Sequence, residues 1–392
     1  MSVRAETAAS TPATFGLPRA LDGALLVAVV AVLLLGLVVM ASASISHAES
    51  QFDAPFHYLN RQLVFLGLTL LFATMTLAVP MDQWYRNSGS LLLLAFALLV
   101  LVLVPGVGRE VNGATRWIPL GVFNLQVAEV AKFGLLFYLA AYLTRRGDRV
   151  RGSMAGFLIP LALLGASGFL MLLQPDFGGA VVLGATGIAL LFLAGVPLWR
   201  FLVFAAGGAA TAWALIITSP YRLSRLTGFT DPWSDPFNTG FQLTQSLIAI
   251  GRGEWFGVGL GGSVQKLFYL PEAHTDFVFA VLAEELGLLG VLVVIGLFAW
   301  ILWRILSIGA ASLRAGHVFG GYVALAVGVW FGLHSFINIG VTMGLLPTKG
   351  LTLPLMSYGG SSLLTTGVAI AVVLRVDWER RRDAGKQGRA AR

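Results

Sequence analysis

Cysteine is absent from this sequence of 392 residues, histidine occurs only five times, and charged residues are scarce. The absence of cysteine excludes disulfides, thiolate catalysis and cysteine-ligated metal sites. Charged residues make up 11% of the chain, which is about half the share found in an average soluble protein. Hydrophobic residues make up 57%, and the mean hydropathy is +0.82. These values exclude an ordinary soluble domain and predict an integral membrane protein.

A cleavable signal peptide and a nucleotide-type phosphate loop are also missing. No small-residue cleavage site follows the first apolar run, so we expect Leu21 to Met40 to be a retained span. No glycine-rich loop of the Walker kind occurs in the chain. The net charge of +7 does not by itself indicate nucleic-acid binding, because in a membrane protein the position of each charge decides its meaning.

Long apolar runs predict an all-α, polytopic membrane protein, because about 20 apolar residues in a helix cross about 30 Å of hydrocarbon. The runs predict about ten transmembrane helices, with one long extracytoplasmic loop between spans seven and eight. Spans six and seven are separated only by Gly195-Val-Pro197. We expect a cytoplasmic tail at 1–20, a membrane domain at 21–376 and a basic cytoplasmic tail at 377–392. The predicted spans are 21–43, 59–80, 88–105, 124–144, 154–173, 178–195, 197–217, 277–303, 316–343 and 358–376.

Lysine and arginine are distributed unevenly between the two sides of this arrangement. With the N-terminus inside, 17 of the 26 basic residues fall on the cytoplasmic side and eight on the outer side, while Lys132 lies within a span. Cytoplasmic loops of membrane proteins carry this excess, so both termini are predicted to be cytoplasmic. The 218–276 loop then faces outward, as do the loops 106–123, 174–177 and 344–357.

The 218–276 loop is the polar, aromatic and glycine-rich part of the chain, and it ends at Asp276 just before an apolar helix expected to start at Phe277. A single long extramembrane loop is where a membrane protein usually carries its function. Asp276 has two interpretations that the residues alone leave open. It is either a helix cap or a general base that accepts a proton from a bound hydroxyl.

Basic residues on the outer face indicate an anionic ligand such as a lipid-linked diphosphate, although each one alone could be a headgroup anchor. A diphosphate leaves as an anion, so one carboxylate suffices, and basic side chains or a divalent cation such as Mg²⁺ or Mn²⁺ replace the general acid of a glycosidase. No residue is assigned to a metal. The basic residues are Arg116, Arg222, Arg225, Arg252, Lys266 and Lys349.

Four charged residues lie within predicted spans: Glu129, Lys132, Glu284 and Glu285. A charge at that depth needs a partner or water. Lys132 and Glu284 lie at matching depths, so we expect Lys132 to bridge spans four and eight, with a local pair to Glu129 as the alternative. Span eight also carries a stripe of small residues for helix packing, formed by Asp276, Ala280, Ala283, Gly287 and Gly290.

Five motifs resemble the SEDS family of polytopic cell-wall polymerases, and its cell-division members more than its elongation members. The resemblance runs from the first span to the last and leaves out the two tails. One departure is Gln126-Val-Ala-Glu129, where the family often has proline, and this makes the start of span four uncertain. The motifs are Val111-Asn-Gly-Ala-Thr-Arg-Trp-Ile118, Gln174-Pro-Asp-Phe-Gly178, the segment 221–233, Gly257 to Asp276, and Pro354-Leu-Met-Ser-Tyr-Gly-Gly-Ser-Ser362.

The resemblance implies a peptidoglycan glycosyltransferase of the bacterial inner membrane at the division septum. It implies transfer of a glycan strand from an undecaprenyl diphosphate donor to lipid II with inversion, and Asp276 as the essential base. It also implies a class B penicillin-binding protein as the transpeptidase partner, other divisome membrane proteins and membrane lipids as contacts, and no nucleic acid. The implied substrate-binding residues are Arg116, Trp117, Glu129, Lys132, Asp176, Arg252, Lys266, His274, Lys349 and Ser357.

Two other functions compete with that of a peptidoglycan glycosyltransferase. A lipid II flippase also fits a polytopic protein with charged residues inside its spans. Against it, the chain shows no inverted internal repeat and no matching polar entrance on the inner face. A non-catalytic divisome scaffold leaves the surroundings of Asp276 unexplained.

Overall fold

In the part of the chain that the structure describes, seven long and three shorter apolar helices form the body of the molecule. The computed structural model describes residues 16–18, 20–111, 113–119, 121, 124–218, 229, 231–238, 240–347 and 350–390. Seven of the helices are long and apolar enough to cross a membrane, and α4, α7 and α8 are shorter apolar helices. They match the ten predicted spans in order, so the ten-helix membrane bundle is confirmed. The helices are α1 (Gly23–Phe52), α2 (His57–Ala78), α4 (Ser88–Leu101), α5 (Val127–Gly152), α6 (Met154–Leu173), α7 (Phe177–Leu193), α8 (Leu198–Ile217), α11 (Val278–Arg314), α12 (Val318–Thr342) and α13 (Gly360–Ala390).

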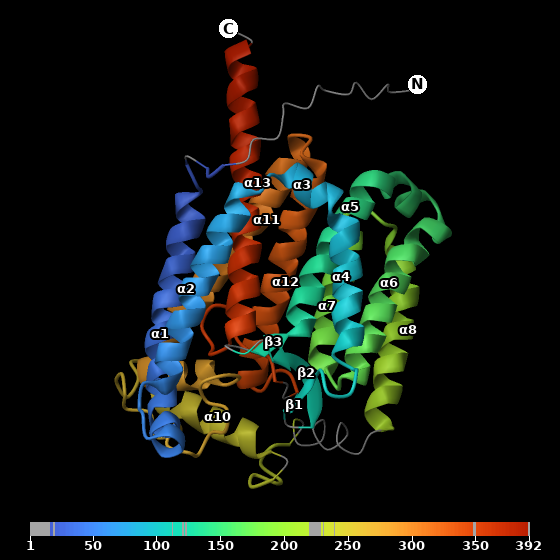
Figure 1. Ribbon diagram of the computed structural model, residues 1–392. Helices are drawn as coiled ribbons and strands as arrows, with labels where there is room; N and C mark the ends of the chain where they lie inside the picture. Colours follow the sequence, from blue (N-terminus) through green and yellow to red (C-terminus); the bar gives the residue numbers. More distant parts are fainter. Residues whose placement is uncertain are drawn as a thin grey trace.

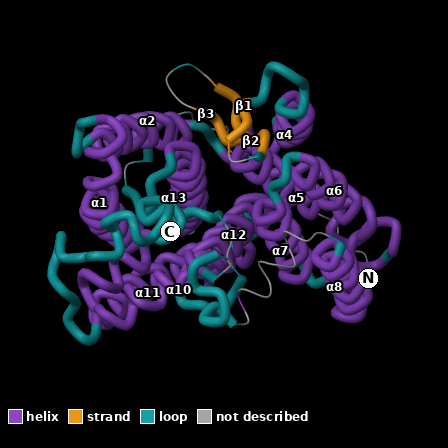
Figure 2. The backbone as a smooth tube through the Cα atoms, turned by 90° about the horizontal axis from the view of Figure 1, so that it is seen from below, coloured by secondary structure: helices purple, strands orange, loops and turns teal. Residues whose placement is uncertain are grey.

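The bundle has two groups of helices with α12 between them (Figure 2). Helices α1, α2, α11 and α13 pack together on one side, and α4 to α8 form the other side. Small residues on α12 allow α11 to approach closely: a side chain at Gly328 would meet Leu306, and one at Gly332 would meet Leu302. The central helix therefore positions both groups.

The outer-loop candidates gather at one end of the bundle. Figure 1 shows the start of α1, the end of α13 and the short helix α3 (Met81–Arg86) at the top, while the strands and helix α10 (Phe241–Gly253) lie at the bottom. Residues from the described part of the 218–276 loop and from the 106–123 loop thus share one end, as the alternation of spans predicts.

A small antiparallel sheet precedes α5 and was not predicted. Its strands are β1 (Arg109–Val111), β2 (Ala114–Pro119) and β3 (Asn124–Gln126), in the order β1-β2-β3. The start of span four at residue 124 was wrong, because Asn124 to Gln126 pair with β2 and the helix begins at Val127. The hydroxyl of Ser361 fixes this strand further, since it accepts from the Gln126 N–H (3.0 Å) and donates to the Asn124 carbonyl (3.0 Å).

Helix α11 is broken at Gly287, where φ is +63°. The predicted stripe along span eight is therefore wrong on two counts. Asp276 lies before the helix, which begins at Val278, and the residues after Gly287 do not continue the face of those before it. A glycine adopts this backbone conformation at little cost, whereas other residues are strained by it.

Ion pairs hold the opposite end of the molecule together. Asp22, which caps the N-terminus of α1, pairs with Arg304 of α11 and with Arg381 of α13 (2.6 Å). Arg381 also pairs with Asp377 (2.6 Å). Helix α13 continues as a helix well past the predicted span end at 376 and projects beyond the other helices (Figure 1).

Candidate active site

Asp276 lies where the start of α11, the end of α12 and the 350–359 loop meet. The side-chain amide of Asn338 on α12 donates to the Asp276 carbonyl (2.9 Å) and to the Leu351 carbonyl. Gly350 approaches so closely that a Cβ placed there would lie 3.1 Å from Asp276 Oδ2. Asp276 itself is half-buried. Asp276 therefore lies at the junction of three separate parts of the chain, and its backbone is held by α12.

The capping alternative for Asp276 does not describe this structure. The N-cap of α11 is Phe277, and no side chain makes a capping hydrogen bond there. The Asp276 N–H instead donates to the Glu272 carbonyl (3.1 Å), which makes the preceding residues a tight turn. Asp276 thus lies one residue before the N-cap of α11, at the end of this turn.

His274 is buried beside Asp276 in a cluster of aromatic rings. Its ring centroid lies 4.5 Å from that of Tyr58, 5.5 Å from that of His47 and 5.8 Å from that of Tyr358. The Tyr358 N–H donates to the His274 carbonyl (2.9 Å). Burial lowers the pKa of His274 to about 4, so the imidazole is neutral near pH 7. His274 is therefore a hydrogen-bonding group rather than a cation in this site.

Ser357 stabilises the turn that follows Leu351. Its hydroxyl accepts from the Leu353 N–H (2.8 Å), and its carbonyl accepts from the Gln62 amide (3.2 Å). Gln62 also accepts from the Gly359 N–H through its own oxygen. The predicted residues Ser357, His274 and Asp276 are therefore brought together by one set of backbone contacts.

Arg116 and Trp117 lie on β2, and Arg116 connects this strand to the 174–176 loop. Its guanidinium donates to the carbonyls of Gln174 (3.2 Å) and Pro175, and its charge lies 4.0 Å from the Asp176 carboxylate. Asp176 caps α7 by accepting from the Gly179 N–H (2.9 Å). Trp117 is half-buried. The three predicted residues lie together and form a bridge between two outer loops.

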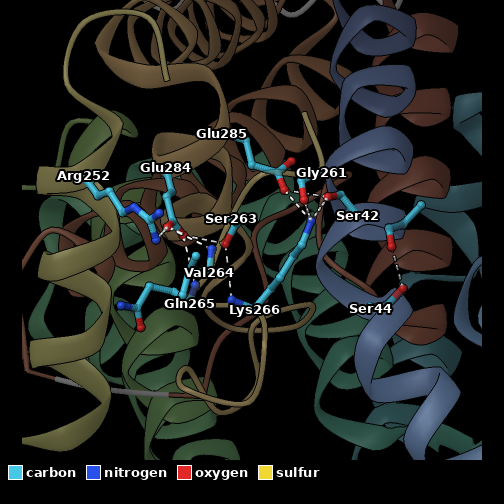
Figure 3. Close-up of polar contacts among 11 residues, drawn as sticks. Ser42, Ser44, Arg252, Gly261, Ser263, Val264, Gln265, Lys266, Glu284 and Glu285 are labelled. Carbon is cyan, nitrogen blue, oxygen red and sulfur yellow. Dashed lines mark hydrogen bonds and ion pairs between the residues drawn. The ribbon is translucent and has the colours of Figure 1, made fainter. Parts of the chain in front are cut away.

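Arg252 and Lys266 each bind one of the two carboxylates that precede the break in α11 (Figure 3). Lys266 Nζ lies 2.8 Å from Glu285 Oε1, 2.8 Å from the hydroxyl of Ser42 on α1 and 2.8 Å from the Gly261 carbonyl. Arg252 at the end of α10 lies 3.4 Å from Glu284. We call Arg252, Lys266, Glu284 and Glu285 the outer clamp.

Glu284 is held by backbone as well as by charge. It accepts from the Ser263 hydroxyl, from the Val264 N–H (3.1 Å) and from the Gln265 N–H (3.3 Å). Both glutamates are fully buried. A buried charge needs such partners, because removing it from water is costly. The outer clamp therefore fastens the 252–266 segment to α11 below Asp276.

The predicted bridge from Lys132 to span eight is wrong. Lys132 Nζ pairs with Glu129 on its own helix at 2.6 Å, and both side chains are buried. The Lys132 ammonium also lies 5.6 Å from the ring of Trp330, and Thr365 of α13 donates to Glu129 (3.4 Å). The glutamates of span eight take their cations from the outer loop instead.

Three of the predicted cations, Lys349, Arg222 and Arg225, lie outside the described residues. The sequence reasoning also missed residues that the site uses. Asn338, Tyr58 and Ser42 were not singled out, because a lone polar residue in an apolar helix has no spacing pattern. Gly350 directly follows Lys349 and precedes the motif that begins at Pro354, but a glycine has no side chain that would mark it as part of a site.

The geometry suits proton transfer at the outer end of the bundle. The rings of His274, Tyr58 and Tyr358 pack together two residues along the chain from the half-buried Asp276, and the cations at 116, 252 and 266 are each paired within the protein. Among the described residues, no group of three or more histidine, aspartate or glutamate side chains is arranged to hold a metal ion.

Known proteins resemble the chain along almost all of its length. A protein of Alkalilimnicola ehrlichii named "Probable peptidoglycan glycosyltransferase FtsW" is 62% identical over 92% of this chain and 90% of its own. A protein of Halorhodospira halophila with the same name is 61% identical over 92% and 91%.

Solved structures agree with the sequence comparison. A chain from a peptidoglycan synthase complex matches with a TM-score of 0.78 at 33% identity, over 92% of this chain and 99% of that one. The rod shape determining protein RodA of Thermus thermophilus matches with a TM-score of 0.69 at 31% identity, over 92% and 98%. The family model described as "Cell cycle protein", which covers FtsW, RodA and SpoVE, matches residues 23–382, and the chain belongs to this family.

Proposed function

We propose that this protein is a peptidoglycan glycosyltransferase that polymerises lipid II into glycan strands for the septal cell wall. The observation that carries the proposal is the position of Asp276, a half-buried carboxylate-bearing residue where α11, α12 and the 350–359 loop meet at the loop-bearing end of the bundle. Relatives over 60% identical across nearly the whole chain are named peptidoglycan glycosyltransferases, which supports the same activity here.

Asp276 acts as the general base in this proposal. Its carboxylate accepts the proton of the acceptor sugar hydroxyl while the hydroxyl oxygen bonds to the anomeric carbon of the donor. The bond from that carbon to the diphosphate breaks, and the undecaprenyl diphosphate leaves with the electron pair. Attack opposite the leaving group inverts the anomeric centre, so no enzyme nucleophile is needed. His274 and Tyr358 supply neutral side chains to the site. Lys349 is the predicted cation that binds the diphosphate.

The proposal also covers the location of the protein and its partner. The protein lies in the bacterial inner membrane at the septum with both termini in the cytoplasm, and a class B penicillin-binding protein supplies the transpeptidase. Similarity to a chain from a peptidoglycan synthase complex supports such a partnership.

The decisive experiment compares Asp276→Asn with wild type in vesicles containing lipid II. The amide keeps the size of the side chain but cannot accept the proton, so polymer formation is expected to fall by about 10²–10⁴-fold. Asp148→Asn, at a fully exposed side chain on the opposite end, is the matched control and should keep full activity. Translocation of lipid II is measured in the same vesicles. Polymerisation that survives in Asp276→Asn contradicts the base, and translocation without polymerisation by the wild type supports the flippase.

A further inference from the structure

The segment 254–260 lies at the point where α11 breaks, and four backbone hydrogen bonds join the two. The Leu288 N–H donates to the Glu254 carbonyl (2.8 Å), and the Leu289 N–H donates to the Trp255 carbonyl (3.2 Å). In the other direction, Val258 and Gly259 donate to the carbonyls of Glu284 (2.9 Å) and Glu285 (3.1 Å). The segment is therefore fixed at the level of Gly287.

The length of α11 after the break allows that level to be the outer edge of the hydrocarbon. The part from Leu288 to Arg314 has 27 residues, and at about 1.5 Å per residue it extends about 40 Å, enough by itself to cross the roughly 30 Å hydrocarbon core. Leu289, Leu292 and Val293 expose about half of their side chains on this stretch, as lipid-facing residues do. Trp300 and Trp303 are exposed further along it, next to Arg304, which pairs with Asp22.

The exposed side chains of the segment are apolar and aromatic. Trp255 is 64% exposed, Phe256 79% and Leu260 60%. Glu254 is the only charged residue between 254 and 262, and the nearby Lys266 is turned inward to Glu285. Side chains of this kind favour the headgroup level of a bilayer over water.

The backbone of the segment also suits that environment. Irregular backbone at membrane depth is tolerated only where its polar groups are bonded within the protein. The carbonyls of Glu254 and Trp255 and the N–H groups of Val258 and Gly259 all have such partners in the broken helix. The break at Gly287 supplies these partners, because a continuous helix would have used them itself.

We propose that segment 254–260 inserts into the boundary between headgroups and acyl chains of the outer leaflet, with bilayer lipid as its partner. The lipid-facing surface of α11 continues directly into Trp255, Phe256 and Leu260. This contact sets the depth of the outer clamp relative to the membrane surface. Because the clamp is attached to the first half of α11, the contact also sets the depth of Asp276, which directly precedes that helix.

The absence of cysteine makes a direct test feasible. Phe256→Cys and Leu260→Cys are each labelled with a nitroxide in the full-length protein, reconstituted into vesicles of phosphatidylethanolamine and phosphatidylglycerol. Leu292→Cys on the lipid-facing surface of α11 and Asn238→Cys on the exposed outer loop are the controls. Collision rates with oxygen, which concentrates in lipid, and with a water-soluble nickel chelate are measured by electron paramagnetic resonance.

The expected result is an oxygen-to-nickel collision ratio at 256 and 260 that is several-fold above that at 238 and approaches that at 292. A ratio equal to that at 238 places the segment in water and overturns the proposal. Low collision rates with both reagents show that protein covers the segment, and they also overturn the proposal in favour of a second copy or a partner chain.

Discussion

Asn338 is the residue on which the placement of Asp276 depends most directly. Its two amide hydrogens hold the carbonyls of Asp276 and Leu351, and its side chain is almost fully buried. No charge or motif marks it in the sequence. A carboxamide is suited to this position because it presents two donors at once to two acceptors.

Asn338→Asp is expected to impair polymerisation more than it impairs folding. The new carboxylate replaces two donors with an acceptor facing two carbonyls, and leaving buried carbonyls unsatisfied costs about 1–3 kcal/mol. We expect a fall in kcat of about tenfold or more, equal to about 1.4 kcal/mol, with little change in KM. Steady-state rates with lipid II measure the effect, and Asn60→Asp on an exposed position of α2 is the control. A raised KM with unchanged kcat would assign Asn338 to substrate binding instead.

Lys132→Ala is expected to destabilise the protein by about 3–5 kcal/mol, because it leaves the buried Glu129 without its cation. Exchanging the two residues, as Lys132→Glu with Glu129→Lys, should restore much of the loss. Thermal unfolding in detergent measures both variants. Rescue of Lys132→Glu by Glu284→Lys in place of Glu129→Lys would show that the pair is not local.

Acidification is expected to destabilise the outer end through His274. Its pKa is lowered by burial to about 4, below the unfolded value of 6.5, so the unfolded chain binds the proton more readily. Stability is therefore full above pH 6.5 and falls as the pH drops towards 4, by about 2 kcal/mol at about pH 5. Unfolding temperatures at about pH 7 and about pH 5 give the loss. His274→Gln should reduce this pH dependence, whereas His317→Gln, at the other end, should retain it.

At the residue scale, the sequence motifs contain residues that the structure brings close together, such as His274 and Tyr358, but they do not show which charged side chains pair. Lys132 and Glu284 were predicted to pair because they lie at the same distance from the outer ends of their spans. That prediction assumed that span eight is one straight helix and that no cation of the outer loop reaches the glutamates. Arg252 and Lys266 reach the glutamates because the loop folds back onto the break, which no periodicity indicates.

At the scale of elements, the two halves of α11 and the segment that joins them behave as one unit. Gly253 and Gly257 pass so close to the broken helix that a side chain would overlap the carbonyl oxygens of Ala283 and Glu285. The hydropathy of the chain predicted ten helices, because each transmembrane helix needs an apolar run long enough to cross the membrane. It did not predict the break or the small sheet, since both depend on backbone pairing between segments distant in sequence.

Gly253→Ala should loosen this unit by about 1–3 kcal/mol, the usual cost of overpacking. Gly251→Ala is the matched control on the same helix, since no atom lies near its added methyl group. It should be neutral or stabilising by about 0.5–1 kcal/mol, because alanine favours the helix. Proteolysis of the 218–276 loop and thermal unfolding distinguish the two. Equal stability of both variants would mean that the contact with Ala283 yields without cost.

At the scale of the whole molecule, the two ends are held by different interactions. The end where α1 begins is joined by ion pairs among Asp22, Arg304, Arg381 and Asp377, whereas the outer end combines the ion pairs of the outer clamp with backbone hydrogen bonds of its loops. The distribution of lysine and arginine predicted which end would be cytoplasmic. It could not predict that these basic residues would also connect three helices.

The orientation can be tested with two single cysteines. Asn238→Cys should react with a membrane-impermeant maleimide in intact spheroplasts, whereas Ala384→Cys should react only after the membrane is opened. The reverse pattern would place the termini outside and remove the basis for chemistry at the outer face.

Helix α13 has a length that exceeds the thickness of any bilayer it crosses. Its 31 residues extend about 46 Å, and the part beyond the contact of Asp383 with His317, from Ala384 to Ala390, extends about 10 Å. This last part projects beyond the other helices at the end of the molecule where α1 begins (Figure 1). A protein bound to its tip would therefore be held away from the lipid surface, with the end of the helix as the spacer.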